Sequence, residues 1–281
     1  MPGPYAKCSA ISSTGSEIFW TAVKKHLDRI NGLPSGPRFL QAIQQTGKRI
    51  TIKMADTSGN STSFANAGAP LLVQAILGDD ETMFRNELKV AIGQAKIKGI
   101  PLDHIARQLS EGLTPVTYRA AKNVVRPQSK VVTPAGADPK AVMAAHAHAA
   151  MRSMGTLQEL RDGRLKLADL TDDWKVDLPR VLRPYLTQGR GADSTVSFDP
   201  ADWKPCSIDP AMKNRHPALG LVHEMIHAYH SATGRNMRVR NAGENLEEVI
   251  TTGLPPYQYE EFSDNRFRTE MGPDVALRMK Y

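Results

Sequence analysis

The chain has 281 residues, of which 41% are hydrophobic and 23% are charged, and this balance predicts a globular protein with a sizeable core. No apolar run approaches the length of about 18 residues that a membrane span needs, so we expect none. The formal net charge is +7, but the basic residues are scattered without interleaved aromatics, which argues against a nucleic-acid-binding protein.

The first 16 residues are small, polar and rich in Pro and Ser, and they predict a flexible segment. They contain no apolar stretch of the kind found in a secretory signal peptide. The chain has only two cysteines, Cys8 and Cys206. This number argues against a disulfide scaffold and agrees with a reducing environment.

The following stretch predicts two helices and a strand. Apolar residues at helical spacing indicate an amphipathic helix over residues 17–31, ended by Gly32, and a second short helix over residues 38–45. Residues 48–54 alternate between apolar and polar side chains, which predicts a half-buried strand. Residues 56–63, D-T-S-G-N-S-T-S, predict a loop.

Between residue 69 and about residue 190 the pattern is mostly helical, with Pro- and Gly-rich breaks between the segments. The expected helices are residues 71–77, 82–98, 102–111, 116–125, 140–160 and 176–186. His146 and His148 point to different faces of their helix, so we expect no metal site there. We interpret residues 70–190 as a helical insertion within a domain that spans residues 17–281.

Residues 194–198 alternate again and predict a strand that ends at Asp199-Pro200. The chain then reads H-P-A-L-G-L-V-H-E-M-I-H-A-Y-H-S-A-T-G over residues 216–234. Pro217 suits the first turn of a helix and Gly234 suits its end, so we expect the central helix of the protein here.

His223 and His227 are four residues apart, so both imidazoles leave one face of this helix and can hold one zinc ion. Glu224 would flank the ion, where it could take a proton from a zinc-bound water. This spacing is the H-E-x-x-H signature of metalloproteases. The alternative is an amphipathic helix that carries two histidines by chance.

A zinc hydrolase needs a third protein ligand. Residues 245–253, N-L-E-E-V-I-T-T-G, predict a second short helix, near whose start lie the candidate carboxylates Glu244, Glu247 and Glu248. Acidic residues in a first turn also suit the helix dipole without any metal. Spacing does not decide between Glu247 and Glu248. His230 lies one turn after His227, and we expect it to act as a supporting or capping group rather than as a ligand.

These two motifs together resemble the NleD-type zinc metalloprotease effectors and, more distantly, the clostridial neurotoxin light chains. The resemblance covers about residues 190–281 and, more weakly, residues 38–66. It implies Glu248 as the third zinc ligand, with Glu247 supporting it. It also implies an α+β, helix-dominated, zincin-like fold with a small sheet packed over the zinc-binding helix, whose edge can take an extended substrate.

The resemblance further implies a zinc endopeptidase that bacteria inject through type III secretion into the host cytosol, with residues 1–16 as secretion segment. Its substrate would be a host signalling protein such as a mitogen-activated protein kinase. We expect a monomer. The alternative is a non-catalytic adaptor, whose helical region binds a host partner and whose zinc is structural.

The last stretch offers further candidates. Tyr257 and Tyr259 either line a substrate groove or pack, and Asp264 and Arg266 read as a structural polar network. Arg278-Met-Lys-Tyr281 resembles the Arg-x-x-Tyr of the toxin light chains, which implies that Arg278 and Tyr281 stabilise the oxyanion of the reaction. The alternative for these two residues is a frayed chain end.

Overall fold

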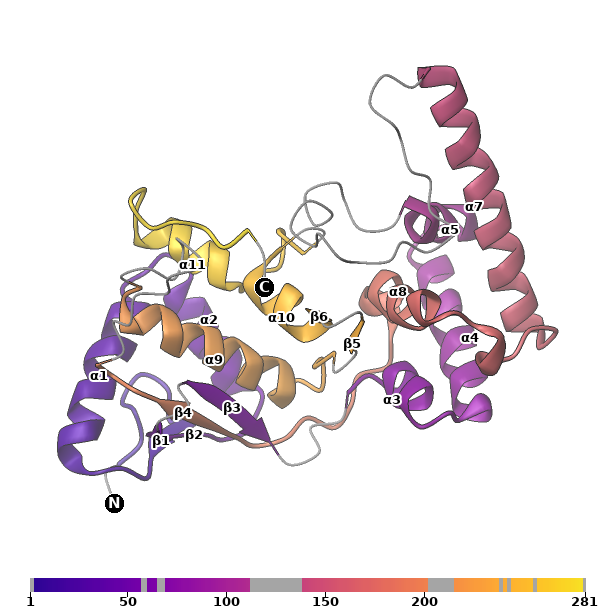
Figure 1. The fold of residues 1–281 in the computed structure, drawn as a ribbon. Coiled ribbons are helices and arrows are strands. Elements are labelled where there is room, and N and C mark those ends of the chain that lie inside the picture. The colour runs from indigo at the N-terminus through magenta and orange to yellow at the C-terminus, as the bar shows by residue number, and fades with distance from the viewer. Residues whose placement is uncertain are drawn as a thin grey trace. The chain divides into compact units, whose positions relative to one another are not determined.

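The computed structural model describes residues 3–56, 60–64, 69–111, 138–201, 215–237, 240–241, 244–254 and 257–279 (Figure 1). The chain divides into two compact units. Unit 1 contains Met1–Ala69, Gln188–Asn236 and Glu247–Tyr281, and unit 2 contains Pro70–Thr187 and Met237–Leu246. The segment that enters unit 2 at Pro70 and leaves it at Thr187 lies close to the range expected for a helical insertion.

Unit 1 contains a mixed four-stranded sheet in the order β1-β2-β4-β3. The strands are β1 (Ile11–Ser13), β2 (Ile50–Met54), β4 (Ser194–Phe198) and β3 (Ser61–Phe64). The first three run parallel, whereas β3 pairs antiparallel with β4 and forms one edge. In the registered pairs, Ile52 lies beside Val196, and both are fully buried. Alternation therefore places one apolar face of the sheet in the core.

The N-terminal segment belongs to this core. Tyr5, Cys8 and Ile11 are all at most 3% exposed, and β1 extends the sheet by pairing with β2. Burial raises the pKa of the Cys8 thiol, whose sulfur lies 3.4 Å from the carbonyl oxygen of Leu40. Residues 5–13 are thus packed rather than flexible, in contrast to the expectation for this segment, because aromatic and aliphatic side chains tie them down. Cys206 lies outside the described residues.

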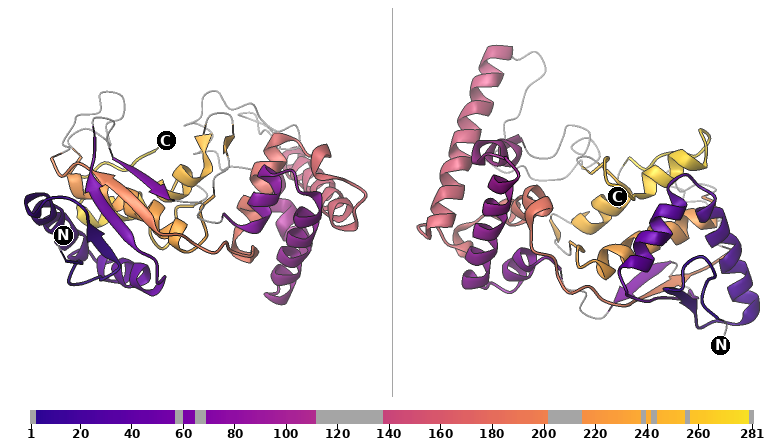
Figure 2. Two further views of the ribbon diagram at one scale, coloured as in Figure 1. Left: turned by 90° about the horizontal axis from the view of Figure 1, so that it is seen from below. Right: turned by 180° about the vertical axis from the view of Figure 1, so that it is seen from behind.

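Helices α1 (Glu17–Asn31), α2 (Gly36–Gln45) and α9 (Pro217–Ala232) pack with the sheet in the core of unit 1, and α11 (Asp264–Met271) adds the buried Phe267. The Ser16 hydroxyl caps α1 by accepting a hydrogen bond from the backbone N–H of Phe19. Helix α9 lies along the sheet and contacts β3, β4 and α1 (Figure 2). The expected small sheet over the central helix is confirmed, and so is the helix-dominated α+β class.

Unit 2 is mainly helical in its described residues, which also form a short antiparallel pair, β5 (Arg240–Asn241) and β6 (Glu244–Asn245). Its helices are α3 (Leu71–Leu77), α4 (Glu81–Ile97), α5 (Leu102–Glu111), α7 (Pro139–Asp162) and α8 (Asp172–Leu182), with single turns η1 (Leu167–Asp169) and η2 (Arg183–Tyr185). None of the described helices combines the length and apolar character that a membrane span requires.

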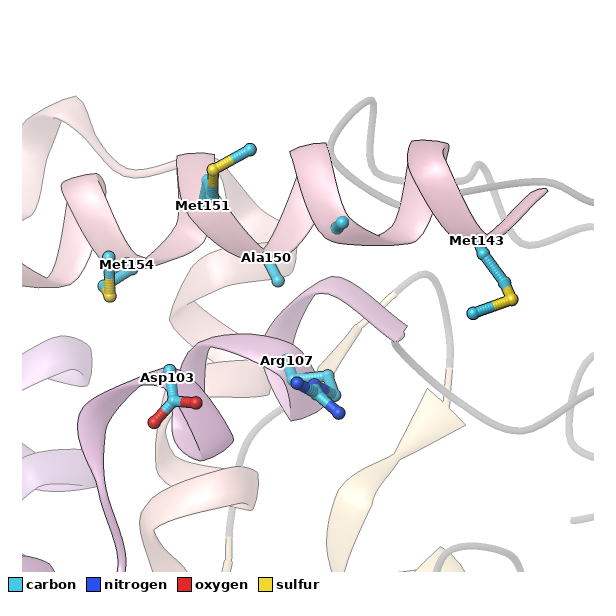
Figure 3. A pocket seen from close by; sticks show the side chains of 7 residues that line it. Asp103, Arg107, Met143, Ala150, Met151 and Met154 are labelled. Carbon is cyan, nitrogen blue, oxygen red and sulfur yellow. The ribbon is translucent and has the colours of Figure 1, made fainter. Parts of the chain in front are cut away.

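A hollow of about 460 Å³ lies between α5 and α7 of unit 2 (Figure 3). Methionines and alanines of α7 form most of its wall, and α5 contributes Asp103 and Arg107. Among the side chains that the structure describes, those lining this hollow include no histidine or glutamate.

Most predicted boundaries agree with the structure. Helices α1, α3 and α5 and strand β4 begin and end where predicted, and α8 begins earlier because the Thr171 hydroxyl caps its first turn. The loop predicted over residues 56–63 is wrong at its end, where β3 begins, because the edge of β4 supplies hydrogen-bond partners to a polar segment. The helix predicted over residues 116–125 lies outside the described residues.

Candidate metal centre

Helix α9 begins as predicted, with Pro217 in its first turn and the His216 imidazole accepting a hydrogen bond from Ala218 N at 3.0 Å. Gly234 follows its end with φ of 65°, a left-handed conformation that favours glycine. Almost every residue of the helix is buried. His223 and His227 therefore project into the protein interior at 5% and 6% exposure.

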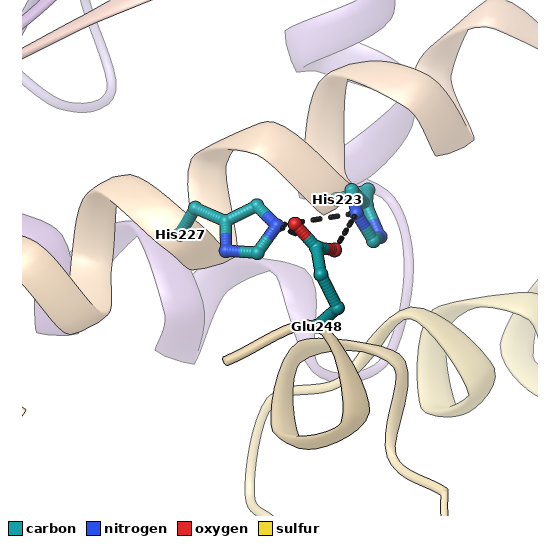
Figure 4. Close-up of side chains that lie close together, drawn as sticks. All are labelled: His223, His227 and Glu248. Carbon is teal, nitrogen blue, oxygen red and sulfur yellow. Dashed lines mark hydrogen bonds and ion pairs between the residues drawn. The ribbon is translucent and has the colours of Figure 1, made fainter. Parts of the chain in front are cut away.

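Glu248 meets these two histidines from α10 (Leu246–Thr252) (Figure 4). Its Oε2 lies 3.2 Å from His223 Nε2 and 3.1 Å from His227 Nε2, and the two Nε2 atoms are 3.3 Å apart. Three ligands of a tetrahedral zinc ion, each bonded at about 2.0–2.1 Å, stand about 3.3–3.4 Å from one another. The three atoms therefore have nearly the spacing of one face of a zinc tetrahedron.

The opposite side of the His227 ring is held by oxygen atoms. Glu247 Oε1 lies 3.4 Å from His227 Nδ1, and the Thr251 hydroxyl lies 3.1 Å from the same nitrogen. The Thr251 hydroxyl donates to Glu247 at 3.3 Å, and His230 Nδ1 lies 2.6 Å from Glu247 Oε1. An Nδ1–H held in this way fixes the ring with Nε2 directed at Glu248, which is the orientation that a metal-binding histidine requires.

His223 has a comparable carboxylate on its Nδ1 side. Asp264, the first residue of α11 (Asp264–Met271), places Oδ2 3.7 Å from His223 Nδ1. Asp264 is 1% exposed, and its charge is balanced by Arg268, whose Nε lies 3.1 Å from Oδ1. Arg278 lies 3.9 Å from Asp264 Oδ2. The aspartate thus connects one imidazole with two guanidinium groups.

The charges of the cluster shift its pKa values strongly. Burial by itself would lower the pKa of His227, but the carboxylates of Glu247 and Glu248 outweigh it and raise this pKa to about 10. Burial would raise the pKa of Glu248, but both imidazoles hold it well below its usual range. Burial likewise opposes ionisation of Asp264, whose contacts with His223 and Arg268 lower its pKa to about 2. The cluster therefore favours ionised carboxylates around positive charge.

These features fit a zinc ion. Two imidazoles and one carboxylate form a donor set that catalytic zinc sites use, with the fourth position open. Among the residues that the structure describes, His223, His227 and Glu248 are the group whose donor atoms converge for a metal. Sequence spacing did not decide which of Glu247 and Glu248 would bind a metal. In the structure Glu248 lies on the Nε2 side of the His227 ring, and Glu247 lies on its Nδ1 side.

Glu224 lies on the same helix and contacts strand β3. Its side chain is largely buried, with 9% of the residue exposed. The Thr62 hydroxyl lies 2.8 Å from Glu224 Oε2 and 2.9 Å from the backbone oxygen of the same residue. A carboxylate next to the candidate metal ligands is thus held by a strand from the other end of the sequence.

Gly220 of α9 lies beside the side chain of Asn60, the residue that precedes β3. A Cβ atom at Gly220 would lie 2.6 Å from the Asn60 side-chain nitrogen and 3.0 Å from a guanidinium nitrogen of Arg215, so an alanine there would require these side chains to shift. The Asn60 side-chain oxygen in turn accepts a hydrogen bond from Asp199 N at 2.9 Å. Asn60 thus joins the start of β3 to the end of β4 beside α9.

The remaining predicted site residues lie in different surroundings. Tyr257 is 7% exposed, which favours the packing alternative, whereas Tyr259 is 88% exposed. Arg278 is buried, and its backbone N–H and C=O both bond to the Asn265 side chain, at 2.7 and 2.8 Å. Tyr281 lies outside the described residues. The chain end is therefore anchored at least as far as Arg278.

Sequence reasoning assigned no role at the site to Thr62, Thr251 or Asp264, although all three contact proposed site residues. Thr251 could have been found from the sequence, because it lies in the T-T-G run that follows the paired glutamates. Thr62 and Asp264 carried no signal, because only the tertiary packing of β3 and α11 against α9 brings them to the site.

Comparison with protein families finds a match over residues 143–281 to the peptidase M91 family, described as effector protein. The match covers slightly less than half of the chain and includes every proposed ligand. It supports a protease effector in general. No curated protein and no solved structure matches the chain.

Proposed function

We propose that the protein is a zinc-dependent endopeptidase that acts as a bacterial effector on a host protein. The observation that carries this proposal is the convergence of His223, His227 and Glu248 with the spacing of a zinc tetrahedron. The similarity to an effector family with a peptidase name supports it.

His223, His227 and Glu248 would hold the metal, and the open fourth position would face the substrate. Zinc bound there would act as a Lewis acid, which polarises a carbonyl group and makes water more acidic. Glu247 and Asp264 lie on the Nδ1 sides of the two imidazoles, from which they would orient these rings toward a bound metal.

Glu224 would serve as general base and then as general acid. Its carboxylate accepts a proton from the attacking water and returns this proton to the nitrogen of the leaving amine. The burial of Glu224 supports this role, because a carboxylate shielded from bulk water transfers its proton to the substrate rather than to solvent.

Arg278 would stabilise negative charge on the carbonyl oxygen in the transition state. Its fixed backbone and burial support a positioned guanidinium rather than a frayed end. The assignment of Tyr281 to the same task rests on the resemblance to the toxin light chains alone.

The adaptor alternative requires a structural zinc site, which is closed by four protein ligands. Among the described residues only three donor groups converge, and His230 is engaged with Glu247 instead. A glutamate directly after the first histidine also has no purpose in a structural site. The open site therefore favours catalysis.

The finer parts of the proposal rest on the resemblance to NleD-type effectors. These are type III secretion by way of residues 1–16, action in the host cytosol as a monomer, and a mitogen-activated protein kinase as substrate. Strand β3 supports an extended substrate segment, because it is an antiparallel edge next to α9 and can accept a further strand.

The proposal is tested by mapping new peptide termini in host-cell lysate after treatment with the zinc-loaded protein. Wild type should release discrete termini, and Glu224→Gln should release none while it retains zinc and the unfolding temperature of wild type. The substrate proposal requires that a kinase activation loop be among the cut sites. Equal termini from wild type and Glu224→Gln would refute the endopeptidase.

A further inference from the structure

Strand β3 brings one hydroxyl group to the carboxylate of Glu224. Within this strand Ser61 and Ser63 are exposed, whereas Thr62 is partly buried and contacts α9. Thr62 stands opposite the fully buried Val196 in the antiparallel pair with β4. Its backbone is therefore held by the sheet, and its side chain faces the helix that carries the candidate metal ligands.

The contact involves two oxygen atoms of one residue. Thr62 Oγ1 lies 2.8 Å from Glu224 Oε2 and 2.9 Å from Glu224 O, so a single hydroxyl bridges the carboxylate and the carbonyl of the same residue. Two such acceptors repel each other unless a donor lies between them. The hydroxyl thus favours the side-chain conformation in which Oε2 lies near the backbone.

We propose that Thr62 is a positioning residue that holds the Glu224 carboxylate in its reactive orientation. This inference rests on the proposed function and adds to it a residue from outside the matched region 143–281. A threonine suits the task, because its β-branched side chain fits a strand and has a restricted χ1 angle. A hydroxyl can donate or accept, so the contact can persist while Glu224 gains and returns a proton.

A structural role for the same contact is the competing explanation, since the hydroxyl also ties β3 to α9. A tie of this kind would affect the stability of the fold and the zinc content. A positioning role would instead affect the rate of the chemical step and depend on the presence of the Glu224 carboxylate. These two roles are separated by measuring stability, zinc content, kcat and KM for the same variants.

The test uses the full-length, zinc-loaded protein and a quenched fluorescent peptide that spans a cleavage site mapped with wild type in host lysate. Thr62→Val keeps the shape of the side chain and removes the hydroxyl, and Thr62→Ser keeps the hydroxyl. Thr195→Val in β4 is the matched control, because Thr195 pairs with Ser63 and not with the residue that faces Glu224.

We expect Thr62→Val to lower kcat by about 10- to 100-fold, the effect of one hydrogen bond to a charged group, with KM and zinc content near those of wild type. Thr62→Ser should restore most of this loss, and Thr195→Val should behave as wild type.

Several results would overturn the inference. Full activity of Thr62→Val would do so while leaving the endopeptidase in place, and so would a loss that Thr62→Ser does not restore. A loss explained by missing zinc or a lowered unfolding temperature would assign Thr62 a structural role. If wild type itself cuts no protein in lysate, the proposed function fails and the positioning role fails with it.

Discussion

The two adjacent glutamates of α10 should respond very differently to the same substitution. Glu248 Oε2 lies 3.2 and 3.1 Å from the two Nε2 atoms, whereas Glu247 Oε1 lies 3.4 Å from His227 Nδ1 and 2.6 Å from His230 Nδ1. Glu248→Gln would remove the one charged ligand of a bound zinc ion. Glu247→Gln would leave all three ligand atoms in place and change only what holds the imidazoles.

The expected magnitudes follow from these positions. A site with four protein ligands binds zinc with about 10–16 kcal/mol, or about 2.5–4 kcal/mol for each ligand. Loss of the Glu248 carboxylate therefore predicts zinc binding weakened by about 100- to 1000-fold. Loss of the Glu247 carboxylate acts through ligand orientation and predicts about 10- to 100-fold.

Zinc affinity is measured by competition with a chromophoric chelator at one near-neutral pH. Glutamine keeps nearly the volume of glutamate, so neither variant opens a cavity. Thermal unfolding of the metal-free proteins controls for loss of fold, which matters most for Glu247 because it is 3% exposed. Equal losses of affinity, or a larger loss for Glu247→Gln, would mean that the structure assigns the wrong carboxylate to the metal.

Three further results are expected. Zinc affinity should rise by up to about tenfold per pH unit as pH increases from slightly acidic values. The reason is that His227, with a pKa of about 10, keeps a proton that zinc must displace. A pH-independent affinity in chelator competition would contradict this. Gly220→Ala should stabilise the protein in urea unfolding by less than Gly93→Ala, for which up to about 1 kcal/mol is expected, because only the new Cβ at Gly220 displaces the Asn60 side chain; equal effects would refute the close approach. Arg278→Ala should lower kcat by about 100-fold or more with little change in KM or zinc content, and an unchanged kcat would remove Arg278 from the reaction.

Periodicity in the sequence predicted the helices well, because burial of one face is a local property that the residue order reveals. Helix α1 and strand β4 have their predicted bounds for this reason. Strand β3, S-T-S-F, has no such signal. Its three polar residues form a strand because the backbone of β4 offers hydrogen-bond partners, and those partners come from residues far along the chain.

The candidate metal centre was likewise predictable only in its local part. The spacing of His223 and His227 is a local property, so the sequence identified both residues. The choice of Glu248 depends on how α10 is rotated against α9, and the contact of Asp264 depends on where α11 begins beside it. Neither rotation nor placement of one helix against another is encoded in the spacing of residues within either helix.

The parallel pairing of β2 with β4 has a consequence for folding during synthesis. Ile50 pairs with Ser194, and the segment Pro70–Thr187 lies between these strands in the sequence. Contacts of such separation form slowly, because a long loop must close first, whereas contacts between neighbouring helices form early. The helices of Pro70–Thr187 can therefore fold on the ribosome before the sheet is complete. Helices α9 and α10 follow β4, so the candidate metal ligands come together only after the helical segment and β4 have been made.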